Sequence, residues 1–127
     1  MATIELTKDN LDSTIEDNDI VLIDFWAEWC APCKMFGPIF KEASEKNPDM
    51  VFASCNTEEQ PEVAGSFGIR AIPTLAVFRE KILVFMQPGA LPGSALNEIV
   101  EKVRELDMDE VRADIEKQKA EQEKGKD

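Results

Sequence analysis

Hydrophobic and polar positions alternate along the chain in a way that predicts short strands separated by helices. Apolar runs of strand length, rich in β-branched and aromatic residues, indicate five strands. These runs fall at residues 3–6, 20–26, 50–56, 74–79 and 82–86. The last two are separated only by Glu80 and Lys81, so they predict an antiparallel hairpin.

The segments between the first strands carry a helical pattern. We expect helices at residues 8–16, with Thr7 as the N-cap, at 32–47, more loosely at 58–67, and from 93 to 106. The second helix is predicted to bury a face made of Met35, Phe36, Ile39, Phe40 and Ala43. The resulting order of elements predicts an α/β fold, with a central mixed β-sheet flanked by helices.

The composition changes after Leu106. Residues 107–127 are mostly charged or amide side chains, and their thin apolar line of Met108, Val111 and Ile115 has helical spacing. We therefore divide the chain into one domain, residues 1–106, and a charged helical C-terminal extension, residues 107–127. The extension is either a solvated helix or a helix that binds a partner or a second copy.

Charge and cysteine usage exclude several classes of protein. The chain of 127 residues has a net charge of −12, which disfavours nucleic acid and anionic membranes as partners. No apolar run approaches the length that a transmembrane helix needs. Residues 1–6 lack the features of a signal peptide, and three cysteines do not suit a secreted disulfide framework. We expect a cytoplasmic protein and a monomer.

Cys30 and Cys33 lie where the strand at 20–26 ends and the helix at 32–47 begins. Backbone N–H groups and the helix dipole favour a thiolate there, lowering the pKa of a cysteine by about one unit. We therefore interpret Cys30 as the reactive thiolate and Cys33 as its resolving partner. A structural disulfide or half a zinc site is the alternative, but zinc needs four ligands and the chain has no histidine. We expect no metal and no cofactor, and an inert buried thiol at Cys55.

Two motifs carry a family resemblance. Residues 25–34 contain Trp-Cys-Ala-Pro-Cys, and residues 69–75 read Ile-Arg-Ala-Ile-Pro-Thr-Leu. With these motifs, residues 3–106 resemble the thioredoxin family, although Ala31 stands where glycine is usual. The resemblance implies the thioredoxin fold and a protein disulfide reductase, in which Cys30 attacks and Cys33 resolves. The implied partners are disulfide-containing proteins and a thioredoxin reductase that recharges the enzyme.

The resemblance also implies roles for residues around the dithiol. Asp24 would lie beneath Cys33 and move its proton, with burial raising the pKa of the carboxyl. The alternative is a structural pair with a lysine, but Ser54 aligns with the position where these proteins often carry that lysine. Pro73 would follow a cis bond, and Trp26 would pack against the cysteine helix. The implied substrate-binding patch consists of Trp29, Pro32, Ala71, Ile72, Pro73, Gly89 and Ala90.

A second class of function stays open at this point. The fold could serve as a binding or chaperone-like module in which the dithiol is incidental. A glutaredoxin-like enzyme would need a glutathione site, and the Trp-Cys-Ala-Pro-Cys motif speaks against it. Reduction of insulin by dithiothreitol, with and without the protein, separates an enzyme from a binding module.

Overall fold

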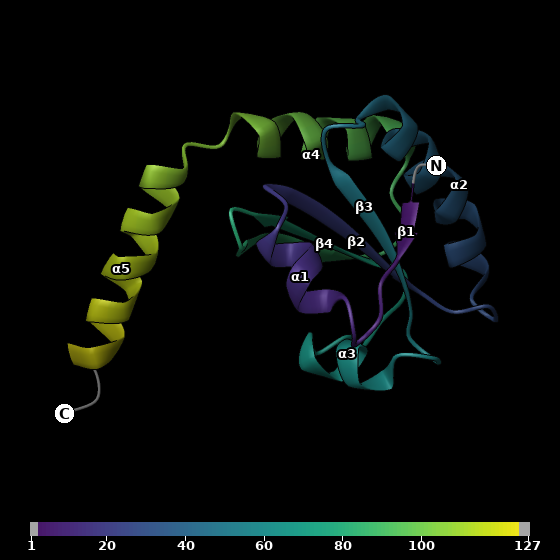
Figure 1. Cartoon of the computed structure of the whole chain (residues 1–127), viewed down its shortest axis with the longest axis horizontal. Helices are drawn as coiled ribbons and strands as arrows, with labels where there is room; N and C mark the ends of the chain where they lie inside the picture. Colours follow the sequence, from purple (N-terminus) through teal and green to yellow (C-terminus); the bar gives the residue numbers. More distant parts are fainter. Residues whose placement is uncertain (1–2, 125–127) are drawn as a thin grey trace.

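The strands of the computed structural model form one mixed sheet in the order β1-β3-β2-β4-β5 (Figure 1). The structure describes residues 3–124. The strands β1 (Thr3–Glu5), β3 (Val51–Asn56) and β2 (Ile20–Trp26) run parallel to one another. By contrast, β4 (Thr74–Arg79) is antiparallel to both β2 and β5 (Ile82–Pro88). The predicted mixed sheet and its hairpin are therefore confirmed.

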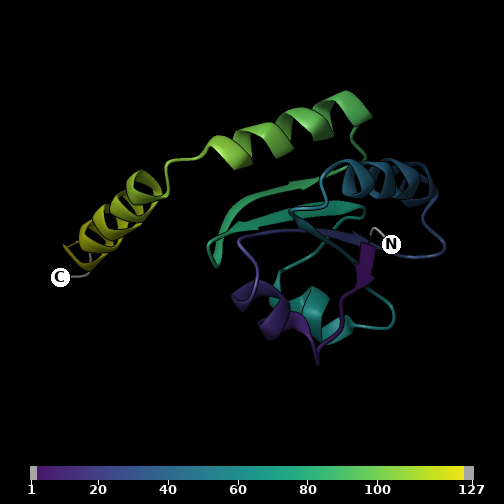
Figure 2. The ribbon, with the colours of Figure 1, turned by 45° about the horizontal axis from the view of Figure 1, so that its top comes forward.

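Helices cover both faces of this sheet. They are α1 (Leu11–Glu16), α2 (Ala31–Lys46), α3 (Pro61–Ser66), α4 (Gly93–Glu105) and α5 (Met108–Lys124). Figure 2 shows α2 and α4 on one side of the sheet and α1 and α3 on the other. The core is correspondingly split in two: Phe36, Phe40 and Leu96 fill the first side, and Phe25 and Val63 belong to the second.

The central strand β2 connects both halves of the core. Its side chains alternate between the faces, so Leu22 packs towards α2 and α4 whereas Ile23 and Phe25 pack on the opposite side. Because both faces are covered, the strand is almost continuously apolar. Asp24 is the exception, and it lies at the carboxyl end of the strand, just before the loop that leads to Cys30.

Two helices begin later than the sequence predicted. The helix α1 starts at Leu11 and not at residue 8, because the Asn10 side chain accepts the Thr7 N–H and closes a turn there. Thr7 is therefore not the N-cap. In the same way, Asn56 accepts the N–H groups of Glu58 and Glu59, so α3 begins only at Pro61. Asparagine favours such turns because its short side chain can bond the backbone two or three residues away.

The prediction that Met35 is buried is wrong. Its side chain is 72% exposed, whereas Phe36, Phe40 and Ala43 are buried and Ile39 packs partly against them. The buried stripe of α2 is thus narrower than the sequence pattern predicted. Met35 precedes the buried Phe36 by one residue and therefore points about 100° away from it around the helix axis.

The end of α4 is held by one side chain from β4. The Nη1 atom of Arg79 donates to the carbonyl oxygens of Val103 at 2.8 Å, Arg104 at 3.3 Å and Leu106 at 3.0 Å. These carbonyls belong to the last turn of α4 and its C-cap, where a cation is favoured, and the Val103 carbonyl also accepts the Leu106 N–H at 3.3 Å. The last residues of α4 are thereby fixed to the sheet.

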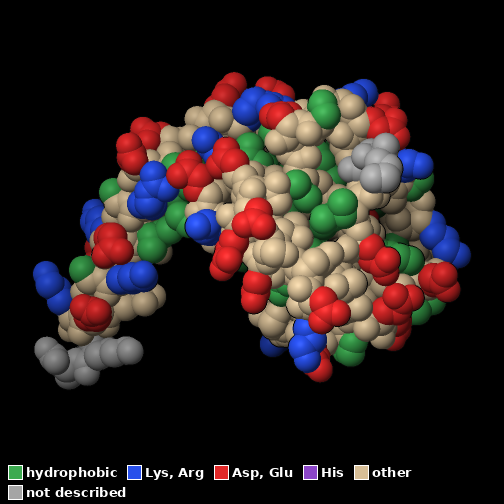
Figure 3. Space-filling model, in the orientation of Figure 1, with side chains coloured by type: hydrophobic (Ala, Val, Ile, Leu, Met, Phe, Trp, Pro, Cys, Tyr) green, Lys and Arg blue, Asp and Glu red, His purple; other side chains and the backbone are tan. Residues whose placement is uncertain are grey.

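The helix α5 follows and extends away from the domain (Figure 1). It is anchored near its start, where Met108 is buried and Arg112 donates to Glu80 at 2.7 Å. The exposed side chains of α5 carry charges of both signs (Figure 3). The predicted helix is thus present as far as Lys124, and residues 125–127 of the predicted extension lie outside the described residues.

Candidate active site

The dithiol occupies the N-terminus of α2. Cys30 is the N-cap residue, and the backbone N–H of Cys33 points at the Sγ atom of Cys30 from 3.3 Å. The two cysteines form a disulfide and both are buried. A sulfur at this place is surrounded by the free N–H groups of the first helical turn, which favour its anionic form once the disulfide is reduced.

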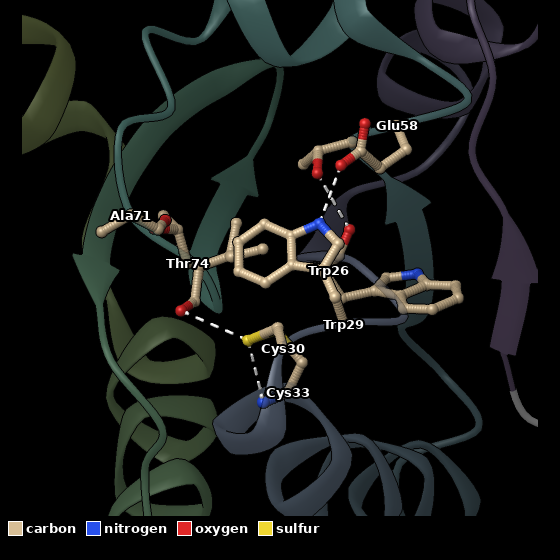
Figure 4. Close-up of a disulfide and its surroundings, with 9 residues drawn as sticks. Trp26, Trp29, Cys30, Cys33, Glu58, Ala71 and Thr74 are labelled. Carbon is tan, nitrogen blue, oxygen red and sulfur yellow. Dashed lines mark hydrogen bonds between the residues drawn. A yellow bond between two sulfur atoms is a disulfide. The ribbon is translucent and has the colours of Figure 1, made fainter.

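The loop that precedes β4 faces the dithiol (Figure 4). The carbonyl oxygen of Ile72 lies 3.6 Å from the Sγ atom of Cys30, and the Ile72–Pro73 peptide bond is cis, as the resemblance implied. Two bonds fix this loop: Thr74 donates to the Ala71 carbonyl at 2.6 Å, and the N–H of Gly89 donates to the Pro73 carbonyl at 2.8 Å. Hydrogen bonds from Thr74 and Gly89 therefore hold the loop beside Cys30.

Trp29 directly precedes Cys30 in the chain. Its side chain is 70% exposed, yet the indole N–H donates to the Glu58 carboxylate at 2.7 Å (Figure 4). Glu58 is positioned in turn by the bond from its own N–H to the Asn56 side chain. No sequence motif pointed to Glu58. The turn-forming Asn56 was a local signal for the loop, but no spacing rule relates Glu58 to a tryptophan 29 residues earlier.

Asp24 lies behind the dithiol, lining a cavity of about 580 Å³ together with Cys33, Trp26 and Ser54. Its side chain is 3% exposed. Burial raises the pKa of Asp24 from an ordinary 3.8 to about 7, because the charged form loses its hydration. The predicted direction of this pKa shift is confirmed. Ser54 pairs with Asp24 in the β2–β3 register. A serine therefore lies beside Asp24 at the position where thioredoxins often carry a lysine.

Two other residues near the site, Trp26 and Cys55, have no proposed part in the chemistry. Trp26 is half-buried at the end of β2 and lines the cavity with residues of the first turn of α2, and its packing against that helix stays a prediction. Cys55 is fully buried in β3. Burial, and secondarily the neighbouring Asp24 charge, raise the pKa of the Cys55 thiol to about 11. Cys55 is therefore a poor nucleophile at neutral pH.

The predicted substrate-binding residues come from three segments. Their burial differs: Trp29, Pro32, Ala71, Gly89 and Ala90 are exposed, Ile72 is half-buried and Pro73 is buried. Ile72 and Trp29 lie beside Cys30, as described above, and Gly89 is tied to Pro73. A binding role for this set stays a prediction.

Within residues 3–124 no group of three or more His, Cys, Asp or Glu side chains could hold a metal ion. Over the same part of the chain, no helix is both long and apolar enough to cross a membrane.

Comparison with known proteins decides the family. The family model named Thioredoxin matches residues 2–104. The chain belongs to the thioredoxin family. It is 57% identical over 119 residues to the putative thioredoxin 2 of Streptomyces coelicolor, covering 94% of this chain and 89% of that protein. It is 38% identical over 103 residues to thioredoxin 1 of a Nostoc species, covering 80% and 96%.

Solved thioredoxin structures have the same fold. A mutant thioredoxin from Halobacterium salinarum superposes with a TM-score of 0.78 at 32% identity, covering 84% of this chain and 94% of that one. Plasmodium falciparum thioredoxin gives a TM-score of 0.74 at 36% identity, covering 79% and 98%. The thioredoxin fold is therefore confirmed.

The family and the dithiol together establish the activity. The chain is a thiol–disulfide oxidoreductase, and the Cys30–Cys33 pair is its redox-active centre. In general terms, thioredoxins act on disulfide-containing substrates and are recharged by a reductase. The alternative of a binding module with an incidental dithiol is not favoured by these findings.

Proposed function

We propose that this thioredoxin reduces protein disulfides with Cys30 as the attacking thiolate and Cys33 as the resolving thiol. The observation that carries this order is the backbone N–H of Cys33, which points at the Cys30 sulfur from 3.3 Å. Cys30 is also the N-cap, where the helix dipole stabilises an anion, whereas Cys33 lies inside the first turn. Cys30 is thus the better thiolate of the two.

The reaction transfers two electrons in two exchanges. The Cys30 thiolate forms a bond to one substrate sulfur while the substrate disulfide breaks, and the departing thiolate takes a proton from water. The thiolate of Cys33 then attacks Cys30, closes the Cys30–Cys33 disulfide and releases the second substrate thiol. A thioredoxin reductase returns both electrons.

Asp24 is proposed to accept the proton that Cys33 must lose. It lines the same cavity as Cys33, and a pKa of about 7 lets it gain and lose a proton at neutral pH. A carboxyl with an ordinary pKa would stay ionised there and hold a proton poorly.

The substrate is proposed to dock across the exposed surface around Cys30. Its extended backbone would pair with the backbone of Ile72, which is fixed beside Cys30 by the Thr74 and Gly89 hydrogen bonds. Trp29 would cover the other side of the bound segment. Pro32, Ala71, Pro73 and Ala90 complete the proposed surface.

The wider context of the reaction is also a proposal. The protein is a cytoplasmic monomer that carries electrons from its reductase to protein disulfides, and so supports cell redox homeostasis. Residues 1–106 form the catalytic domain, which the match of the family model to residues 2–104 supports, and residues 107–127 form a charged helical extension. The alignment to the Streptomyces relative covers 94% of this chain, so it includes residues beyond Leu106. This supports an extension that the two proteins share.

The order of the cysteines is tested by trapping. Cys33→Ser should accumulate mixed disulfides with insulin, because attack survives and resolution does not, whereas Cys30→Ser should accumulate none. Both variants should lose the acceleration of insulin reduction by dithiothreitol that the parent protein gives. Traps that form through Cys33 would reverse the proposed order, and a parent protein without any acceleration would contradict the reductase function itself.

A further inference from the structure

Asp24 is a buried carboxyl without a partner. Its Oδ1 atom has no hydrogen-bond donor among the described residues, and the side chain is 3% exposed. A buried oxygen of this kind costs free energy unless something bonds to it. The residue beside it in the register is Ser54, whose hydroxyl can both donate and accept.

A cleft leads from Asp24 to the surface. The cavity of about 580 Å³ that Asp24 lines shares Trp26, Glu28 and Ser54 with a second hollow of about 300 Å³. This second hollow continues to Glu5 on β1 and to Glu59 beyond β3. The indole N–H of Trp26 is another buried polar atom without a partner in the described chain. Two residues that line the cleft, Asp24 and Trp26, therefore each carry a buried polar atom without a partner in the described chain.

The charges along the cleft favour a cation. Glu5, Glu28 and Glu59 are exposed carboxylates on its lining, against one lysine, Lys34, which is also exposed. A metal ion does not suit the cleft, since no three potential ligands gather anywhere in residues 3–124. A cation that carries its own hydrogen-bond donors is a better match for a single carboxyl and a hydroxyl.

We propose that this cleft binds an alkylammonium group, the lysine side chain of a docked partner protein. An ammonium is compact, has three donors, and can bond Asp24 and Ser54 together, whereas a guanidinium is a wide planar fork. The alkyl stem would lie along Trp26 and Ala27, which line the same cavity.

This inference does not depend on the order in which the cysteines react. The cleft and the dithiol meet at Cys33, which lines the cavity with Asp24. An ammonium beside Asp24 stabilises the carboxylate form of Asp24. A partner with a lysine at this place would therefore set the proton state of Asp24 as it docks.

The first test titrates the full oxidised chain with n-propylammonium chloride at constant ionic strength. The readouts are the NMR signals of the Trp26 indole N–H, the Ser54 amide and the Asp24 carboxyl. We expect saturable shifts of all three, with no such shifts from tetramethylammonium, which has no N–H donors. Asp24→Asn should bind propylammonium about tenfold more weakly, because a charge-assisted bond is lost.

A matched pair of variants locates the site at Ser54. Ser54→Lys supplies the ammonium from within the chain, so it should abolish propylammonium binding and lower the pKa of Asp24. Ser54→Met fills the cleft with a chain of similar length and no charge, so it should block binding without lowering that pKa. Unsaturable shifts, or binding that survives Asp24→Asn and Ser54→Lys unchanged, would overturn the proposal and assign the effect to the surface carboxylates.

The second test separates a partner lysine from a free amine. Disulfide-bonded peptides are compared as reductase substrates, with lysine or norleucine at each position near the cysteine. A severalfold preference in kcat/KM for lysine at one position, lost in Ser54→Lys, would support the proposal. No preference at any position would overturn the assignment to a partner lysine, even if propylammonium binds.

Discussion

The N-terminus of α2 and the C-terminus of α4 face the same physical problem and solve it in opposite ways. Each helix end leaves backbone groups without partners inside the helix. At α4, the Arg79 guanidinium bonds three terminal carbonyls, and its charge does not change during the reaction. At α2, the corresponding N–H of Cys33 points at a sulfur whose charge changes during the reaction.

The difference extends to the side chains behind each end. Both sites keep one buried polar atom without a hydrogen-bond partner among the described residues, Arg79 Nε and Asp24 Oδ1. Arg79 has the carboxylates of Asp19 and Glu80 within ion-pair distance, whereas burial raises the pKa of Asp24 to about 7. One helix end is therefore held by a fixed charge, and the other lies beside a group that can change its charge at neutral pH.

The largest expected effect is the gain in stability on replacing Asp24, because burial of its charged form lowers the free energy of unfolding. The folded chain holds the proton of Asp24 up to about pH 7 and the unfolded chain only to about pH 4, so the parent loses stability as the pH rises between these values. Asp24→Asn has no charge to bury. It should be more stable than the parent by up to about 4 kcal/mol above pH 7, with little difference below pH 4. Urea unfolding at several pH values measures this.

The same variant should be a poorer enzyme. Without a carboxyl to take the proton of Cys33, turnover in insulin reduction at pH 7 should fall by about 10²-fold. A variant less stable than the parent at pH 8 would mean that Asp24 is paired and structural. Unchanged turnover would show that Asp24 has no part in the mechanism. The start of α2 would then not differ from the end of α4 in having a reactive group behind it.

Arg79→Met should have the opposite effect, a loss of stability with unchanged activity. It removes the donors of three carbonyls and should lower the free energy of unfolding by about 2–3 kcal/mol, since bonds to a charged group are strong. Arg79→Lys, which keeps the charge without the fork, should recover part of the loss. Insulin reduction by the folded protein should not change. A variant as stable as the parent would show that Arg79 does not close the end of α4.

Removal of α5 should have a smaller effect. A chain that ends after Leu106 keeps the dithiol, the loop at Pro73 and both halves of the core, so it should retain its reductase activity. It loses the buried Met108 side chain, at a cost of about 1–2 kcal/mol in urea unfolding. Met108→Ala in the full chain is the matched control and should account for most of that loss. Loss of cooperative unfolding would show that α5 is part of the domain.

The smallest effect is expected at Glu58. Glu58→Ala frees the indole of Trp29, so the surface beside Cys30 is less well ordered for a substrate. KM for insulin should rise about threefold with kcat unchanged, which is the size of one exposed hydrogen bond. Glu58→Gln keeps an acceptor and should restore most of the affinity. A change in kcat without one in KM would contradict a positioning role.

The sequence predicted those features that depend on local patterns. The strand at Ile20–Trp26 was predicted with its observed bounds, because an apolar run of that length, interrupted only by Asp24, fits a strand covered on both faces. The placement of Cys30 at a helix start followed from the same run and the helical pattern after it. The cis bond before Pro73 could come only from the family resemblance, since the base rate for such bonds is about 5–6%.

Other features needed the fold itself. Met35 is apolar but exposed, and only the orientation of α2 on the sheet decides which side of the stripe is buried. The pairing of Glu58 with Trp29 and the contacts of Arg79 join residues far apart in the chain, for which the sequence has no period. The late start of α1 reflects competition, because the Asn10 side chain bonds Thr7 in preference to extending the helix.

The burial of Cys55 has a practical consequence for measuring electron flow. With a pKa of about 11, only about one part in ten thousand of this thiol is ionised at neutral pH, and no solvent reaches it. An alkylating mass tag applied to the native chain should therefore leave Cys55 unmodified in both redox states. Any tag that the native chain gains on reduction then reports the Cys30–Cys33 pair alone, without replacement of the third cysteine.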